Sequence, residues 1–361
     1  MTEAGRPTSP TDLVPLPAQP EGRAWPTLAW ATAEVDGDAD RLDDLLDRAF
    51  RRNPNPTLAL TSACVVVQGG RVVAERYGPA TTSRTPLISW SMAKSILHVA
   101  VGLAVGDGIV DLDAMPVAPE WADSPDHRGI TFRSLLAMRD GLDFSEDYVD
   151  ASTSHCIEML FGTGKGDTAA YAASRPVAAA PGERFNYSSG TTNILSRALG
   201  DALAAARGLT GPAGRREATE DFLQARLFRP LGMSAEPRYD DAGTWVASSY
   251  VYASARDFAR FGLFALRDGT WDGTRLLPEG WIDEGRRRVS DDPDGELGYG
   301  AQWWDYADGR GTFAAKGYEG QSILCVPAAD LVVVRLGKTP VDQRPALEAW
   351  YGEILDCFPT A

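Results

Sequence analysis

A serine and a lysine stand three residues apart at the start of the apolar segment SWSMAKSILHVAVGLAVG, residues 89–106. On a helix, Ser91 and Lys94 would share one face, so their side chains could meet. The free N–H groups and the positive dipole end at a helix start favour a developing oxyanion. The pair could therefore be a nucleophile and its base. The alternative is a serine that caps the helix, followed by a lysine that only adds charge.

Lysine is rare in this chain, and its rarity bears on that choice. The sequence holds four lysines, at positions 94, 165, 316 and 338, against 31 arginines. A composition that avoids lysine, yet places one at the head of an apolar helix, favours the catalytic interpretation of Lys94.

A tyrosine lies in a second segment, PGERFNYSSGTTNILSRALG, where proline and glycine precede a predicted helix. Tyr187 stands just before that helix, and a tyrosine that points into a cleft can relay a proton between nucleophile and leaving group. The alternative is an aromatic side chain that packs a loop. Ser189, two residues later, is a candidate contact to substrate or a helix cap.

A glycine-bracketed segment, AAKGYEGQSILCVP, enters a predicted buried strand. Gly317 and Gly320 would allow a backbone N–H to approach a ligand closely. Such an N–H, together with that of Ser91, would complete an oxyanion hole. A glycine bulge at a strand end explains the same residues equally well.

Hydrophobic periodicity predicts the elements that must hold these residues. A hairpin is expected at Gly69-Gly70, between β-branched runs over 60–68 and 71–78. Helices are expected over 38–52, after Ser91, and over 131–142, 167–176, 191–208, 218–233, 254–269 and 344–358. Strands are expected over 298–306, 311–317, 320–327 and 330–337.

The order of these elements suggests a sheet built from both ends of the chain. We expect a proline-rich tail over 1–28, an α/β domain formed by 29–88 and 246–361, and a helical domain over 89–245 that carries the nucleophile. The fold class is therefore α/β, with an antiparallel sheet flanked by helices and an all-helical insertion.

Composition limits the partners and the compartment. The net charge of −15 argues against nucleic acid and anionic membrane surfaces, and no apolar run is long enough to span a bilayer. The four scattered cysteines and an N-terminus without a secretory pattern indicate a cytoplasmic protein. Histidines and cysteines lack metal-ligand spacing, so neither metal nor cofactor is expected. Monomer and homodimer both remain open.

Together, the three segments resemble the serine β-lactamase and penicillin-binding-protein superfamily. Ser91-Met92-Ala93-Lys94 matches its S-x-x-K motif, Tyr187-Ser188-Ser189 matches its Tyr-x-Asn motif, and Ala315-Lys316-Gly317 matches its Lys-Thr-Gly motif. Within the superfamily, the chain looks most like the 6-aminohexanoate-dimer hydrolases and class C-like carboxylesterases. The likeness covers roughly residues 55–340.

The resemblance implies roles for particular residues. Ser91 would be acylated, Lys94 would activate it, and Tyr187 would relay protons and act on the deacylating water. The N–H groups of Ser91 and Tyr318 would bind the oxyanion. The resemblance also suggests contacts with substrate; the candidates are Tyr148, Ser189, Gly317 and Glu319.

Two positions depart from the superfamily pattern. Ala315 stands where a lysine or histidine usually holds a substrate carboxylate, and Ser189 stands where asparagine is usual. The chain is therefore expected to be a serine hydrolase that forms an acyl-enzyme with a small ester or linear amide. The alternatives are a β-lactamase or D,D-peptidase and, from another class, a catalytically silent binding protein with this fold.

Overall fold

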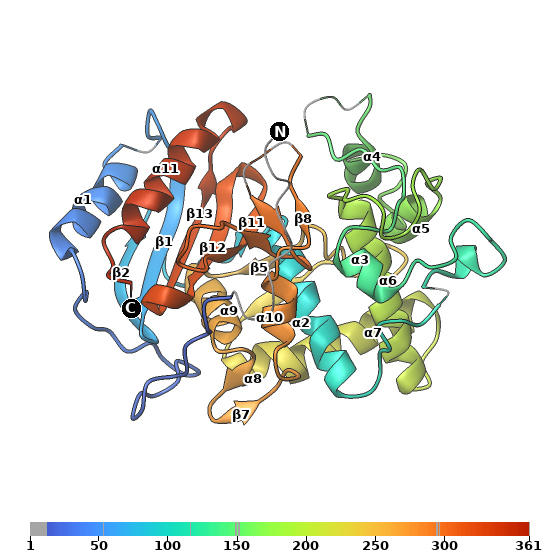
Figure 1. The fold of residues 1–361 in the computed structure, drawn as a ribbon, viewed down its shortest axis with the longest axis horizontal. Coiled ribbons are helices and arrows are strands. Elements are labelled where there is room, and N and C mark those ends of the chain that lie inside the picture. Colours follow the sequence, from blue (N-terminus) through green and yellow to red (C-terminus); the bar gives the residue numbers. More distant parts are fainter. Residues whose placement is uncertain are drawn as a thin grey trace.

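The computed structural model describes residues 13–360, except positions 53, 116, 149, 151, 294 and 296. In this part of the chain an eight-stranded antiparallel sheet has the strand order β2-β1-β13-β12-β11-β10-β9-β8 (Figure 1). Two of its strands come from the start of the chain and six from beyond residue 289. The predicted fold class, an antiparallel sheet flanked by helices, is confirmed.

The strands of this sheet differ widely in length. The two glycines of the predicted hairpin both have positive φ, 55° at Gly69 and 75° at Gly70, and they join the first two strands as expected. The bounds are β1 (Leu60–Gln68), β2 (Arg71–Tyr77), β8 (Ser290–Asp291), β9 (Gly298–Tyr299), β10 (Trp304–Asp305), β11 (Phe313–Gly317), β12 (Gln321–Val326) and β13 (Leu331–Lys338).

The prediction of one strand over 298–306 is wrong. The segment forms two short antiparallel strands, with Trp304 opposite Tyr299. The chain reverses between them, where Gln302 takes a φ of 64°. Gly300 lies in the same turn, and only glycine fits there, because a Cβ would meet the Gly285 carbonyl oxygen at 2.1 Å. Hydrophobic spacing alone does not reveal such a reversal.

Each face of the sheet carries its own core. Side chains alternate along β1, so Cys64 and Val66 face α1 (Ala39–Phe50) and α11 (Arg344–Leu355). Val65 and Val67 face the other side, which holds α2 (Met92–Gly106) and α9 (Ala255–Leu266). Figure 1 shows α1 and α11 on one side of the strands.

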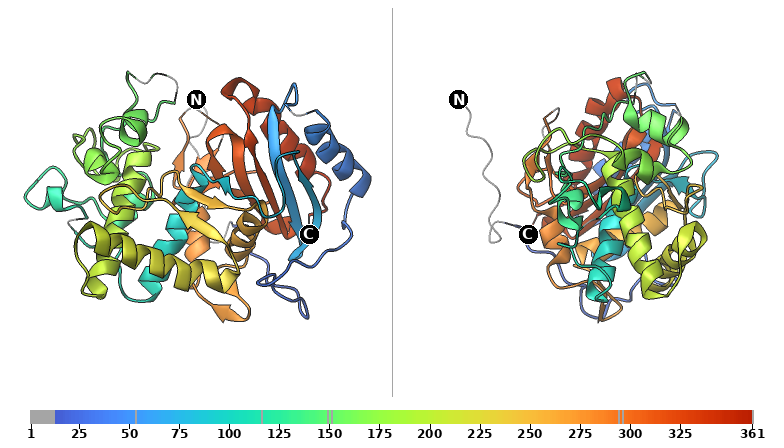
Figure 2. Two further views of the ribbon diagram at one scale, coloured as in Figure 1. Left: turned by 180° about the vertical axis from the view of Figure 1, so that it is seen from behind. Right: turned by 90° about the vertical axis from the view of Figure 1, so that its right-hand side faces the viewer.

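The middle of the chain forms a largely helical block at the end of the molecule away from α1 (Figure 2). Its elements are η2 (Pro119–Trp121), α3 (Phe132–Leu136), α4 (His155–Phe161), α5 (Thr168–Ala173), α6 (Ser189–Ala206), α7 (Gly211–Leu223), the π-helical turn η3 (Gln224–Phe228) and α8 (Arg229–Leu231). The helix expected over 131–142 is shorter because Met138 adopts a φ of 56°. The exact domain boundaries stay a prediction.

Smaller elements connect the block to the sheet. A second sheet has the order β3-β5-β4, and a two-stranded hairpin pairs β6 with β7. The bounds are β3 (Leu87–Ile88), β4 (Ala235–Pro237), β5 (Val251–Ala253), β6 (Thr270–Trp271), β7 (Thr274–Arg275), α10 (Trp281–Arg286), η4 (Tyr318–Gly320), η5 (Pro327–Ala329) and η6 (Val341–Gln343).

Part of the predicted N-terminal tail, residues 1–12, lies outside the described residues, and residues 13–31 follow the surface of the α/β part. Buried arginines bind the backbone of this strap: Arg260 donates to the Pro26 carbonyl at 2.8 Å and Arg267 to that of Pro17 at 3.2 Å. The strap is therefore attached along its length by polar contacts.

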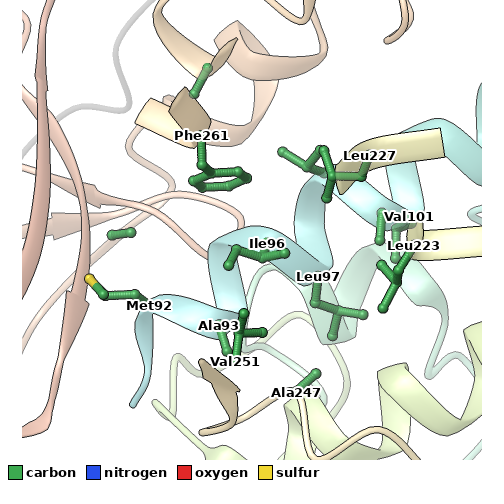
Figure 3. Packing of buried hydrophobic residues seen from close by; sticks show 14 of the residues in the cluster. Met92, Ala93, Ile96, Leu97, Val101, Leu223, Leu227, Ala247, Val251 and Phe261 are labelled. Carbon is green, nitrogen blue, oxygen red and sulfur yellow. The ribbon is translucent and has the colours of Figure 1, made fainter. Parts of the chain in front are cut away.

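The helix that follows Ser91 runs through the middle of the molecule. Every residue of α2 from Met92 to Ala104 is buried, as expected for a helix that is apolar all round. Figure 3 shows Ile96 beside Phe261 of α9, and Val101 beside Leu223 and Leu227 of the helical block. Packing on all sides thus fixes the position of the helix start.

Candidate active site

The turn that leads into α2 is strained and firmly held. Trp90 has a φ of 45°, which is unfavourable for a residue with a side chain. Ser89, fully buried, donates its hydroxyl to the Trp90 carbonyl at 2.9 Å and accepts from the Val251 N–H at 3.0 Å. These bonds tie the turn to β5, so Ser91 is presented at a fixed place as the N-cap of α2.

Lys94 contacts Ser91 directly. Its side chain is buried, and its Nζ donates to Ser91 Oγ at 3.0 Å, to Ser189 Oγ at 3.1 Å and to the Ser248 carbonyl at 3.0 Å. Three acceptors from three segments hold the amine in place against the serine hydroxyl. Ser91 makes no side-chain capping bond to its own helix, so the helix-cap alternative does not describe its hydroxyl.

Tyr187 completes this group from the loop before α6. Its ring lies beneath Lys94, with Nζ 4.8 Å from the ring centroid. Burial raises the pKa of Tyr187, and the charge of Glu146 adds to this, whereas the charge of Lys94 and side-chain hydrogen bonds with Ser91 and Lys94 oppose it. The phenol is therefore protonated at neutral pH and can donate a proton.

Glu146 is a residue of the site that the sequence motifs did not reveal. It accepts from Ser189 Oγ at 2.5 Å, from the Ser189 N–H at 2.8 Å and from Tyr148 OH at 2.6 Å. Ser189 is buried at the start of α6, which Ser188 caps by accepting from the Thr191 N–H at 2.9 Å. A chain of contacts thus runs from Glu146 through Ser189 to Lys94.

Tyr148 lies close to the predicted oxyanion residue. Its ring centroid is 5.1 Å from that of Tyr318, and its pKa is raised well above its usual value by burial and by the charge of Glu146. Its phenol is therefore neutral, and its one O–H proton is donated to Glu146. Both tyrosines line the space around Ser91.

The lysine near the end of β11 is bound by residues on the α11 side of the sheet. Ala315 lies in the core that contains α2, and successive side chains of a strand point to opposite faces, so Lys316 points toward α11. There its Nζ donates to Glu348 Oε1 at 2.5 Å and to Tyr306 OH at 2.8 Å.

The glycine after Lys316 is required by packing against the serine turn. A Cβ at Gly317 would meet the Ser89 carbonyl oxygen at 2.5 Å and the Cβ of Trp90 at 3.2 Å. Tyr318 follows the last residue of β11, so its N–H lies beyond the sheet pairing. This arrangement brings the two predicted oxyanion donors, at Ser91 and Tyr318, to neighbouring element ends on the same cavity.

Glu319 differs from the other substrate-contact candidates. It has a φ of 60°, and its carbonyl accepts from Arg335 Nη1 at 3.2 Å and from the Thr339 N–H at 2.9 Å. It is not among the residues that line the two cavities at Ser91. Gly317, Tyr148 and Ser189 each line at least one of them.

Two cavities meet at Ser91. The larger, about 550 Å³, is rich in polar groups, including Glu146, Asn186 and Arg344. The smaller, about 310 Å³, is mainly apolar, with Trp90, Ile157 and Leu160 in its wall. Ser91, Tyr148 and Tyr318 line both cavities, so the serine borders one cavity with charged and amide side chains and another with a mainly apolar wall.

Comparison with known proteins identifies the family. Residues 46–356 match the beta-lactamase family. The chain belongs to this family. It is 28% identical over 347 residues to the 6-aminohexanoate-dimer hydrolase of Paenarthrobacter ureafaciens, covering 90% of this chain and 82% of the relative.

Solved structures of other proteins share the fold. A Bacillus anthracis protein, provisionally described as a 6-aminohexanoate-dimer hydrolase, has a TM-score of 0.72 at 21% identity, covering 94% of this chain and 88% of that one. A penicillin-binding protein from Bacillus halodurans has a TM-score of 0.61 at 19% identity, covering 85% and 99%. Among the described residues, no helix is both long and apolar enough to cross a membrane.

Proposed function

We propose that this chain is a cytoplasmic serine hydrolase that forms an acyl-enzyme with a small carboxylic ester or linear amide. The observation that carries the proposal is the contact of 3.0 Å between Lys94 Nζ and Ser91 Oγ, with the amine held by two further acceptors. A nucleophile touched by an immobilised base is the arrangement that covalent catalysis needs. Membership of a hydrolase family supports the same conclusion.

Acylation involves three proton transfers. Ser91 Oγ attacks the substrate carbonyl carbon and passes its proton across the 3.0 Å contact to Lys94 Nζ, a step that requires Lys94 to enter as the free amine, while the backbone N–H groups of Ser91 and Tyr318 bind the oxyanion. As the carbonyl oxygen reforms its double bond, the bond to the leaving group breaks. Tyr187 donates its phenolic proton to that leaving group and regains one from the Lys94 ammonium.

Deacylation reverses these roles. A water molecule attacks the acyl carbon and gives a proton to the Tyr187–Lys94 pair, and the bond to Ser91 Oγ then breaks as the serine takes a proton back. Glu146 does not touch the reacting atoms in this scheme. It positions Ser189, and through it Lys94, by accepting two hydrogen bonds from Ser189.

The cavities support a substrate with unlike ends. The smaller cavity, with Trp90, Ile157 and Leu160, suits an aliphatic stem, whereas the larger one offers charged and amide side chains. An unbranched ester or ω-amino acid amide combines these properties. Ala315 stands where the superfamily usually has a lysine or histidine, which argues against the recognition of β-lactams through a strand lysine.

Initial rates on 4-nitrophenyl valerate and on the linear dimer of 6-aminohexanoate test the proposal. Wild type should cleave at least one of them, and Ser91→Ala should lower kcat/KM by roughly 10⁴-fold or more. Ser95→Ala is the matched control, because Ser95 lies on the same helix but donates to the Gln302 carbonyl at 2.6 Å, on another side.

The outcomes separate the remaining alternatives. Faster hydrolysis of nitrocefin than of either substrate would favour a β-lactamase. If none of the three substrates is hydrolysed and Ser91 does not react with a fluorophosphonate, the chain is a binding protein with this fold and the proposal is wrong.

A further inference from the structure

Arg344 brings a cation to the cavity that contains Ser91. It is the first residue of α11 and lines the larger cavity together with Ser91 and Tyr318. Its guanidinium carbon lies 5.5 Å from the centroid of the Tyr318 ring, so the side chain is supported by an aromatic face. The reaction scheme above does not use this residue.

The guanidinium has no protein carboxylate to neutralise it within the described residues. Its Nε is buried there without a hydrogen-bond partner, an arrangement that is rare in folded proteins. Glu348, one helical turn later, is the natural partner of Arg344. Both of its oxygens are engaged elsewhere, by Lys316 Nζ at 2.5 Å and by Tyr306 OH at 2.9 Å.

The position of Arg344 on its helix adds to the positive charge. The start of an α-helix is the positive end of its dipole, where acidic side chains are stabilising and basic ones are not. The first turn of α11 contains no acidic residue, and Gln343 makes no side-chain capping bond. A basic residue placed against the helix dipole breaks a local rule, and such departures are expected at functional sites.

We infer that Arg344 selects substrates with a carboxylate group remote from the scissile carbonyl, and that it binds this carboxylate in the larger cavity. The inference rests on the proposed function, since it concerns the substrate of the same site. Guanidinium is well suited to the task because its planar N–H groups can bind both carboxylate oxygens. Lys316 also lines this cavity, but its Nζ already donates to Glu348 Oε1 and to Tyr306 OH.

Binding by calorimetry tests the inference without turnover. In the Ser91→Ala background, 6-acetamidohexanoate should bind more tightly than its neutral primary amide. Adding Arg344→Gln should weaken the anion by roughly 10- to 100-fold and change the affinity for the amide by less than about twofold. Arg344→Lys should keep part of the preference, because it keeps the charge without the planar fork.

The matched control is Arg229→Gln, since Arg229 is exposed on α8 and does not line the cavity. This control should leave both affinities unchanged. Equal affinities for anion and amide, or a preference for the anion that survives Arg344→Gln, would overturn the inference. Failure of the proposed function gives a different result: wild type and Ser91→Ala would then hydrolyse the test substrates at the same rate.

Discussion

Replacing Lys94 with methionine removes the amine that lies 3.0 Å from Ser91 Oγ and leaves a side chain of similar length. General-base catalysis by a positioned group contributes about 10²- to 10⁴-fold to the rate. At about 1.36 kcal/mol per factor of ten, the activation barrier should rise by roughly 2.7–5.4 kcal/mol. We therefore expect kcat/KM on 4-nitrophenyl valerate to fall by about 10²- to 10⁴-fold.

The chain offers a matched lysine close to the same cavity. Lys316 pairs with Glu348, and the two side chains are 22% and 40% exposed. An ion pair of this kind contributes about 1 kcal/mol or less to stability. Lys316→Met should therefore change kcat/KM by less than about threefold. The Lys-Thr-Gly motif of the superfamily would instead predict that the strand lysine matters more for activity than this.

A second variant separates the base from the positive charge. Lys94→Arg keeps a cation and its donors but cannot be deprotonated in a protein, so it should be as inactive as Lys94→Met. The assay is the steady-state rate with a far-UV circular dichroism spectrum for each variant. If folded Lys94→Met retained more than about a tenth of the activity, or if Lys316→Met lost more, the assignment of Lys94 as base would be wrong.

Two further predictions concern charge. Glu146→Gln should lower kcat/KM about tenfold, because Ser189 would be positioned less firmly. The charge of Glu146 raises the pKa of Tyr187, so the alkaline limb of the pH–rate profile of this variant should move to lower pH. An alkaline limb at the wild-type pH would contradict this prediction. Burial lowers the pKa of His98 from 6.5 to about 3, so only the unfolded chain binds this proton between those values, and stability is lost as pH falls below 6.5. The free energy of unfolding, measured by urea denaturation, should fall by about 2 kcal/mol between pH 7 and pH 5. His98→Gln should lose less stability over the same range. Parallel plots of unfolding free energy against pH for the two proteins would contradict this prediction.

The sequence predicted the contact between Ser91 and Lys94 because its signal is local. Ser91 and Lys94 are one helical turn apart, and any helix starting there brings them together. The glycines of the first hairpin and the β-branched runs around them predicted β1 and β2 for the same reason. The motif containing Tyr187 precedes a helix, and the structure places it beside Lys94.

Other parts of the site depend on contacts between distant residues, which a sequence does not display. Glu146 lies in a loop without periodicity, and its partner Ser189 is 43 residues away. The Ser248 carbonyl that holds Lys94 belongs to the backbone, so no residue type marks it. The direction of Lys316 became clear only when the pairing of β11 assigned each residue to a face of the sheet.

The pairing of β1 with β13 has a consequence for synthesis of the protein. Val66 and Val333 are direct partners in the sheet, although about 260 residues separate the two strands. A ribosome adds about 5–20 residues per second, so the first hairpin waits roughly 15–50 s before its partner strand exists. During that time β1 presents an unpaired apolar edge, and the nascent chain is a natural client for chaperones that shield exposed strands.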